Sequence, residues 1–250
     1  MSNAMRLIEE MGRREYAGVA ELSRALSLSK PSVDRLLSTL INSGFVEQDA
    51  DTKKYRLGMK LVAIADSIRP RTSLIDIAKP HLAVLARRFA ETVNLGTLVG
   101  GSVIYADTIP SQRPFRIELR AGTMLPAHNT GVGKAILAFR PNWEVERYIE
   151  ENEFERLTPR STDSGDELRK RLSETRAKGF AVDDGEILEE ACCASAPVFD
   201  AEGLAIAAIS ITAPRSTFYR IYDDAVAAIL HAAARTSADN IVASGQGRSR

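Results

Sequence analysis

The chain has 250 residues, of which 44 % are hydrophobic and 26 % are charged, and its formal net charge is zero. This is the composition of an ordinary folded protein with room for one large and one small domain, and it excludes disordered and collagen-like chains. No apolar run approaches the ~20 residues that span a bilayer, and no basic-then-apolar secretory signal begins the chain, so we expect a cytoplasmic protein without a membrane partner.

The N-terminal part predicts a small helical module. Residues 1–4 precede a second methionine and resemble an added leader, so the first domain is expected to begin at Met5. A short helix from Met5 to about Arg13 should brace the elements that follow. Its apolar residues are Leu7, Ile8 and Met11.

Two further helices joined by a tight turn are predicted between residues 17 and 42. Apolar residues recur at three-to-four residue spacing in both, which gives each helix one inward stripe. Ser29 is suited to cap the second helix, Pro31 falls in its first turn, and Gly44 ends it. The stripes consist of Val19, Leu22 and Leu26 in the first helix and Val33, Leu36, Leu37, Leu40 and Ile41 in the second.

A hairpin follows, with a turn at residues 49–52, so residues 5–57 predict a winged helix-turn-helix. The outer side of the second helix and the tip of the hairpin carry Arg, Lys, Ser and Thr, the residue types that contact base edges and phosphates. The candidate DNA-binding residues are Lys30, Ser32, Arg35, Ser38, Thr39, Lys53 and Lys54. An ordinary amphipathic helical hairpin with solvated charges is the alternative, and the order of the elements favours double-stranded DNA as the partner.

Residues 58–73 predict a linker helix. Leu57, Leu61, Ile64 and Ile68 follow one another at spacings of four, three and four, which forms a narrow seam. This seam favours pairing with a second subunit, as a homodimer or as one pair of a tetramer, and packing on its own domain is the alternative. Residues 69–73 form the expected boundary.

Residues 74–243 predict an α+β domain, because strands are grouped at both ends with helices before, between and after them. The predicted helices are 75–89, 130–139, 165–178 and 217–243. The predicted strands are 93–99 and 102–109, joined through Gly100 and Gly101, then 114–119, 180–183, 192–199 and 204–212. Residues 244–250 are expected to be a flexible tail.

The segment LSKPSVDRLLSTLINSGFVEQD, followed by KKYRLGMKL, closely resembles the DNA-binding end of the IclR-type transcription regulators. The resemblance continues to about residue 240. It implies a winged helix-turn-helix, a linker helix and a GAF-like effector-binding domain with an antiparallel sheet. It also implies a DNA-binding regulator without enzymatic activity that senses a small molecule. Because a two-fold dimer reads paired half-sites, we expect a roughly palindromic operator, and because the helix start at Gly131 favours negative charge, we expect a small carboxylate effector.

The GVGKA stretch at residues 131–135 predicts a helix start. A P-loop would need a glycine at His128 and a Ser or Thr at Ala135, so ATP binding is not expected. Free N–H groups at a helix start can hold a carboxylate. Close packing alone is the other explanation of the two glycines.

The resemblance to the family implies an effector site at Gly131, Val132, Asp183, Cys193, Ser210 and Thr212. Independently of it, Ser210 and Thr212 are two apart in a predicted strand and so face the same way. Asp183 and Asp184 should point to opposite sides. Glu190 departs from the family, which often has glycine there, and would add a carboxylate near the site.

No catalytic, metal or cofactor site is expected. Cys192 and Cys193 are adjacent, which suits neither a structural disulfide nor metal ligation, and His81, His128 and His231 lie in separate elements. Two other functions stay open at this point. One is a small-molecule enzyme fused to a nucleic-acid module, with Cys193 or Asp183 acting on substrate, and the other is a DNA-binding protein without an effector.

Overall fold

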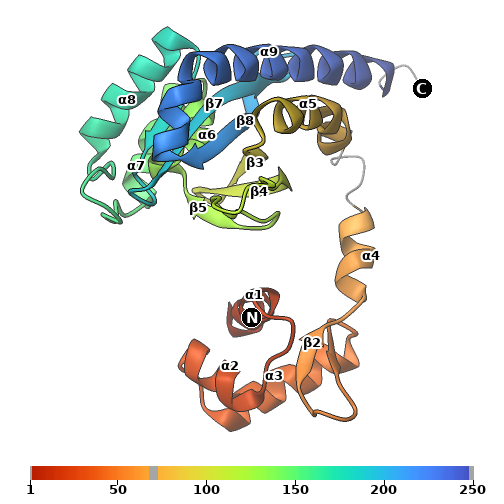
Figure 1. Ribbon diagram of the computed structural model, residues 1–250. Coiled ribbons are helices and arrows are strands. Elements are labelled where there is room, and N and C mark those ends of the chain that lie inside the picture. The colour runs from red at the N-terminus through yellow and green to blue at the C-terminus, as the bar shows by residue number, and fades with distance from the viewer. Residues whose placement is uncertain (1, 68–72, 248–250) are drawn as a thin grey trace. The chain divides into compact units, whose positions relative to one another are not determined.

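The computed structural model describes residues 2–67 and 73–247 (Figure 1). The chain divides between residues 72 and 73 into two compact units. The N-terminal unit contains helices α1 (Ser2–Gly12), α2 (Val19–Leu26) and α3 (Lys30–Asn42). A two-stranded antiparallel hairpin of β1 (Val46–Gln48) and β2 (Tyr55–Leu57) follows them.

One apolar core holds the N-terminal unit together. Leu7 and Met11 of α1, Leu22 of α2, and Val33 and Leu37 of α3 are all at most 2 % exposed. Full burial of each such side chain is worth about 1.5–3 kcal/mol relative to exposure. The three helices and the hairpin therefore form the predicted winged helix-turn-helix.

Local signals place the ends of α2 and α3 where the sequence predicts them. Ser29 Oγ accepts a hydrogen bond from Ser32 N, and Pro31 lies in the first turn of α3, where a missing N–H is tolerated. Gly44 adopts a φ of +76° just beyond the helix, a conformation that favours glycine. Glu21 caps α2 by accepting a hydrogen bond from Gly18 N at 2.8 Å.

Helix α4 spans Lys60–Ser67 and forms part of the predicted linker helix. Val62 and Ile64 are 51 % and 45 % exposed, so α4 has an apolar surface within its own unit. Ile68, the last residue of the predicted seam, and most of the predicted boundary lie outside the described residues.

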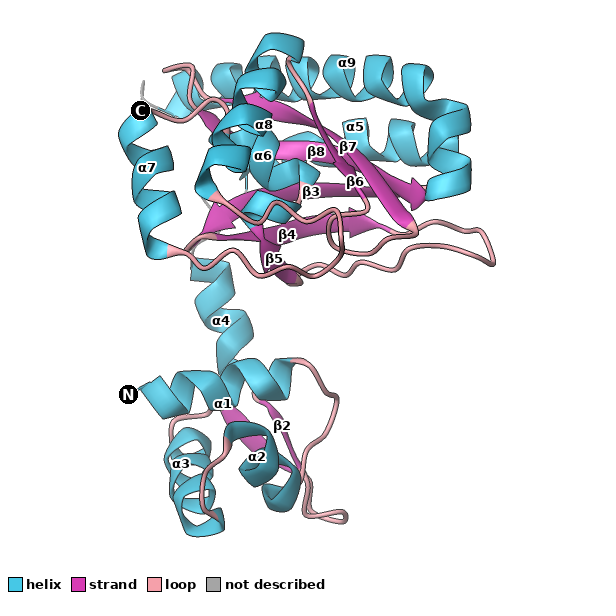
Figure 2. Ribbon diagram, turned by 90° about the vertical axis from the view of Figure 1, so that its left-hand side faces the viewer, coloured by secondary structure: helices cyan, strands magenta, loops and turns pink. Residues whose placement is uncertain are grey.

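The C-terminal unit is built on a six-stranded sheet of order β5-β4-β3-β8-β7-β6, in which every neighbouring pair is antiparallel (Figure 2). This sheet, with helices on both faces, confirms the predicted α+β class. The strands are β3 (Thr92–Val99), β4 (Ser102–Ile109), β5 (Met124–Pro126), β6 (Ala181–Asp184), β7 (Ala191–Phe199) and β8 (Ala205–Pro214).

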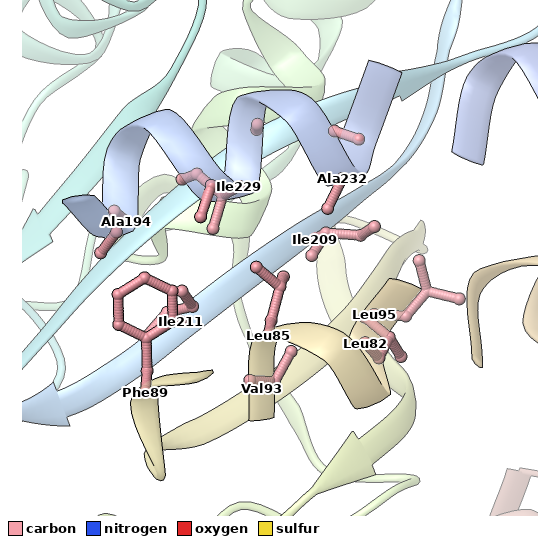
Figure 3. Close-up of a cluster of buried hydrophobic side chains, with 14 of the residues drawn as sticks. Leu82, Leu85, Phe89, Val93, Leu95, Ala194, Ile209, Ile211, Ile229 and Ala232 are labelled. Atoms are coloured by element: carbon pink, nitrogen blue, oxygen red, sulfur yellow. The ribbon is translucent and has the colours of Figure 1, made fainter. Parts of the chain in front are cut away.

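Two helical layers cover the sheet, each with its own core. Helices α5 (Ser73–Phe89) and α9 (Arg215–Gly247) pack on one face, where Leu82, Leu85 and Ile229 contact residues of β3 and β8 (Figure 3). Helices α6 (Gly131–Leu137), α7 (Asn142–Glu151) and α8 (Gly165–Lys178) belong to the opposite face. Buried polar residues, among them Asp183, Ser195 and Ser210, lie on this second face of the sheet.

Two expectations for this unit are wrong in detail, and one helix was not expected. Residues 114–119 are not a strand, and β5 pairs with the edge of β4 in their place. Helix α9 continues to Gly247, so residues 244–247 of the expected flexible tail are helical, and the rest of the tail lies outside the described residues. Helix α7 was not predicted.

Candidate DNA-reading surface and effector site

Helix α3 presents the candidate DNA-binding residues on its outer side. Lys30, Arg35, Ser38 and Thr39 are exposed, and Ser32 is half-buried beside the N-cap. The hydroxyls of Ser38 and Thr39 each donate to the carbonyl four residues earlier, both at 2.9 Å. Within the described chain the Arg35 guanidinium forms no hydrogen bond or ion pair, so it is available to a ligand outside the unit.

The wing tip is shaped by Asp49. Its Oδ1 accepts hydrogen bonds from Thr52 N and Thr52 Oγ1, both at 2.7 Å, and these bonds lower the pKa of its carboxyl. Lys53 and Lys54 follow this turn and are exposed, with Lys53 at a φ of +57°. Arg56 instead pairs with Glu47 across the hairpin at 2.9 Å, so it is already committed to a carboxylate.

In the C-terminal unit, strand register brings four of the six candidate effector residues to one face of the sheet. Asp183 pairs with Cys193, and Cys193 pairs with Thr212. Directly paired residues share a face, and Ser210 follows at a spacing of two on β8. These four side chains are at most 7 % exposed.

We call the side chains of Asp183, Cys193, Ser210 and Thr212 the polar row. The start of α6 lies directly against it. A Cβ added to Gly131 would lie 2.7 Å from Ser195 Oγ and 3.2 Å from Cys193 Sγ, so glycine permits the close approach. A Cβ on Gly133 would lie 2.2 Å from the Ala127 carbonyl oxygen, so that glycine serves packing. The two explanations offered for the glycines therefore apply to different residues.

Two buried N–H groups are free at this helix start. Thr130 Oγ1 accepts from Gly133 N at 2.9 Å, whereas no described acceptor meets the N–H of Gly131 or Val132. Because α6 has only seven residues, these two donors matter more than any helix dipole. Buried donors without an acceptor are costly, and an acceptor supplied by a ligand would relieve that cost.

Asp183 has an unusual titration. Burial raises the pKa of its carboxyl to about 7, although the nearby Lys134 ammonium and a 2.7 Å hydrogen bond from Glu186 N act in the opposite direction. At neutral pH the protonated and ionised forms of Asp183 therefore coexist. The protonated form can donate a hydrogen bond, whereas the ionised form can only accept one. Asp184, its neighbour, faces other partners and pairs with Arg215 at 2.8 Å.

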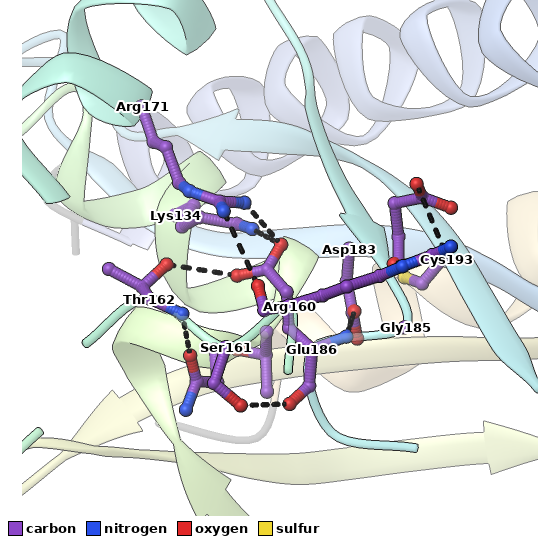
Figure 4. Close-up of polar contacts among 12 residues, drawn as sticks. Lys134, Arg160, Ser161, Thr162, Arg171, Asp183, Gly185, Glu186 and Cys193 are labelled. Carbon is purple, nitrogen blue, oxygen red and sulfur yellow. Dashed lines mark hydrogen bonds and ion pairs between the residues drawn. The ribbon is translucent and has the colours of Figure 1, made fainter. Parts of the chain in front are cut away.

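A buried ion pair beside Asp183 escaped the sequence analysis. The Lys134 ammonium contacts the Glu186 carboxylate, and both side chains are at most 2 % exposed (Figure 4). Arg171 also reaches Glu186 at 2.9 Å, and Thr162 Oγ1 donates to it at 3.0 Å. Lys134 is thus held by a carboxylate and is not free for a phosphate. Its place in the apolar run GVGKAILAF was the available signal for burial.

Of the other polar residues named in the sequence, His128 is buried and Glu190 faces solvent. His128 Nδ1 lies 2.7 Å from the Tyr148 hydroxyl, and burial lowers the pKa of His128 to about 4, so its ring is neutral. Glu190 is exposed and does not add a carboxylate to the polar row, contrary to the expectation. The buried carboxylate near Asp183 is Glu186.

Two further residues of the polar row were missed. Asn94 of β3 and Ser195 of β7 are both 0 % exposed, and both pair in register with Ser210 of β8. The position of Asn94 depends on the pairing of β3 with β8, which joins segments more than a hundred residues apart and has no local signal in a single sequence. Ser195 lies two residues after Cys193 on β7, so the period of two in a strand was the available signal for it.

The fold and the two sites define a DNA-binding regulator with a separate ligand-binding domain. Family models match over most of the chain: the IclR helix-turn-helix domain over residues 2–50 and the bacterial transcriptional regulator IclR C-terminal domain over residues 68–238. The chain belongs to the IclR family of bacterial transcription regulators.

Relatives agree with this assignment. The HTH-type transcriptional regulator KdgR of Dickeya chrysanthemi is 33 % identical over 235 residues, which is 94 % of this chain and 77 % of that protein. A transcriptional regulator of Rhodococcus sp. RHA1 has a similar structure, with 26 % identity, a TM-score of 0.79 and coverage of 97 % and 98 % of the two chains.

An IclR homologue from Microbacterium hydrocarbonoxydans, crystallised with 4-hydroxybenzoate, shares the fold. Its TM-score is 0.80 at 23 % identity, with 95 % of this chain and 97 % of that chain covered. Within the described residues, no helix is both long and apolar enough to cross a membrane.

Proposed function

We propose that the C-terminal domain senses a small monocarboxylic acid and that its occupancy changes how the N-terminal modules bind an operator. The observation that carries this proposal is the pair of N–H groups at Gly131 and Val132, which meet no acceptor among the described residues and pack against a buried polar row on four strands. Buried polar groups are normally satisfied, so an unpaired donor pair beside several hydroxyls fits a ligand. The candidate effector residues remain Gly131, Val132, Asp183, Cys193, Ser210 and Thr212.

The charges of the site orient this effector. Its carboxylate should lie at the N–H groups of Gly131 and Val132, because donors without an acceptor favour an anion. Its neutral polar end should lie toward Asp183 and Cys193, since an ionised Asp183 repels a carboxylate but accepts a hydrogen bond from a hydroxyl. We therefore expect a hydroxy or oxo acid with one carboxylate to bind better than a dicarboxylate.

DNA binding is assigned to the outer side of α3 and to the wing. Arg35 is proposed to contact bases, and Lys53 and Lys54 are proposed to contact phosphates. A homodimer would present two such modules to a roughly palindromic operator, and we expect it to act in the cytoplasm. The rival enzymatic role lacks support, because burial raises the pKa of the Cys193 thiol and disfavours a thiolate nucleophile.

Calorimetric titration tests the effector site. The wild type, Ser210→Ala and Asp183→Ala are each titrated with lactate, 4-hydroxybenzoate and succinate. Ser210→Ala should weaken binding by roughly 0.5–1.5 kcal/mol, or about twice that if the hydroxyl meets the carboxylate. Thr97→Val is the matched control. It also removes a hydroxyl between β3 and β8, since Thr97 Oγ1 donates to the Ile206 carbonyl at 2.8 Å, but Thr97 is not a candidate effector residue. Equal affinities in wild type, Ser210→Ala and Asp183→Ala for an acid that shifts DNA binding would place the pocket elsewhere.

A further inference from the structure

Asn94 lies at the β3 end of the polar row, and its hydrogen-bond partners in the row are on the neighbouring strand β8. Its Nδ2 donates to Ser210 Oγ at 3.1 Å and to Thr212 Oγ1 at 3.3 Å. Its Oδ1 is buried and meets no partner among the described residues. The amide therefore uses both of its hydrogens on two hydroxyls that belong to the candidate effector site.

The direction of these bonds decides what the two hydroxyls can do. Each oxygen accepts a hydrogen from Asn94, so each hydroxyl retains its own hydrogen for donation. If the amide were turned over, Oδ1 would accept from both hydroxyls and two buried N–H donors would be stranded in place of one acceptor. The observed orientation leaves fewer unsatisfied groups and is the one that a buried amide favours.

Only a weak acceptor now faces the two hydroxyls. Cys193 lies opposite Thr212 on the neighbouring strand. Burial raises the pKa of its thiol, and hydrogen bonds from the Ser195, Thr212 and Ser210 hydroxyls act to lower it. Sulfur accepts hydrogen bonds weakly, so a carboxylate oxygen would readily replace it.

We propose that Asn94 is a positioning residue that turns Ser210 and Thr212 into donors and thereby makes the site selective for a carboxylate over its amide. This inference rests on the proposed function. A carboxylate offers acceptors only, which matches the donors at Gly131, Val132, Ser210 and Thr212. A primary amide would place its two N–H donors where a carboxylate places an acceptor oxygen. Donor would then face donor, and the amide would bind more weakly.

The test compares acid and amide in one protein. Wild type and Asn94→Asp are titrated with lactate and lactamide, and with 4-hydroxybenzoate and 4-hydroxybenzamide. The Asp carboxylate accepts from Ser210 and Thr212 and so withdraws both hydrogens from the ligand, and its negative charge also repels the acids. Affinity for the acids should fall at least tenfold, and the ratio of acid to amide affinity should also fall at least tenfold. Thr97→Val should leave this ratio unchanged.

A second measurement tests the same inference without Asn94→Asp, in case that variant does not fold. Asn94→Ala is made in the wild type and in the Ser210→Ala, Thr212→Val background, with thermal unfolding confirming that each protein is folded. Asn94→Ala should weaken acid binding in the wild type and cause no further loss in the second background, because Asn94 acts through those hydroxyls. An equal loss in both backgrounds, or an unchanged acid-to-amide ratio in Asn94→Asp, overturns this inference alone. Failure of wild type to bind any of the acids overturns the proposed function with it.

Discussion

Asp183 is the titratable residue through which pH should act on effector binding. Its pKa of about 7 lies above the usual 3.8 because the carboxyl is buried, with Lys134 and Glu186 as its charged neighbours. A raised pKa means that Asp183 favours the folded state most below about pH 4 and loses this contribution as pH rises through 7. A carboxylate ligand would raise the pKa further, so binding should take up a proton.

We therefore expect the affinity for lactate to fall as pH rises from 6 to 8.5, by up to about tenfold per unit above the pKa. Asp183→Asn should flatten this dependence and bind more tightly than wild type at pH 8.5, since the repelling charge is gone. Calorimetry in two buffers of different ionisation enthalpy measures the proton uptake. The same pH slope in both proteins would show that another group titrates.

Arg35 and Lys54 should differ in the kind of DNA contact that they make. Arg35→Ala should cost about 1–3 kcal/mol on the preferred site and relax specificity, as expected for a residue that reads a base. Lys54→Ala should weaken all sequences alike and reduce the salt dependence by about one unit, as expected for a phosphate contact. Fluorescence anisotropy with selected and random duplexes at several salt concentrations measures both effects. An equal loss on both duplexes for Arg35→Ala would remove its role in specificity.

Helix α4 is the element expected to join two subunits. Leu61 and Ile64 lie on one stripe of this helix, and Ile64 is 45 % exposed within its own unit. Ile64→Asp should lower the affinity for a full palindromic operator at least tenfold while sparing a half-site, because it places a charge in an apolar seam. Ala63→Asp, off the seam on the same helix, is the matched control. Full-operator binding that survives Ile64→Asp would show that α4 packs within its own chain.

Elements defined by local signals could be predicted, and those defined by distant partners could not. The helix cap at Ser29 and the turn at Gly100 and Gly101 depend only on neighbouring residues, and both were predicted. The two glycines have positive φ. Residues 114–119 read as a strand, yet Thr92 Oγ1 donates to Ile117 O at 2.8 Å, so a side chain holds the segment and no strand ladder forms there. Helix α7 buries only Val145 and Tyr148, too few apolar residues for a clear stripe.

The candidate site shows the same division. Ser210 and Thr212 could be paired from the period of two in a strand, and they do share a face. Ser195 follows in the same way from Cys193, two residues earlier on β7. Asn94 and the Lys134–Glu186 pair depend on which strands and helices become neighbours across the domain. Residues that share a strand could thus be grouped from their spacing, whereas residues from distant strands and helices could be grouped only in the three-dimensional structure.

For the whole molecule, the central claim is that a ligand in the C-terminal domain changes DNA binding by the N-terminal module. Linkage requires the reverse as well, so operator DNA must change the affinity for the acid by the same factor. An acid that binds equally well with and without DNA would bind the protein without regulating it.

The most direct test titrates the full chain onto a duplex selected from a random library, with and without a saturating acid from the calorimetric panel. We expect the acid, at a concentration that saturates wild type, to change the Kd for the selected duplex at least fivefold in wild type, a typical allosteric coupling, and to change it less in a Ser210→Ala, Thr212→Val variant that binds the acid more weakly. The account would be contradicted by an acid that binds wild type in the calorimeter and leaves its Kd for the duplex unchanged.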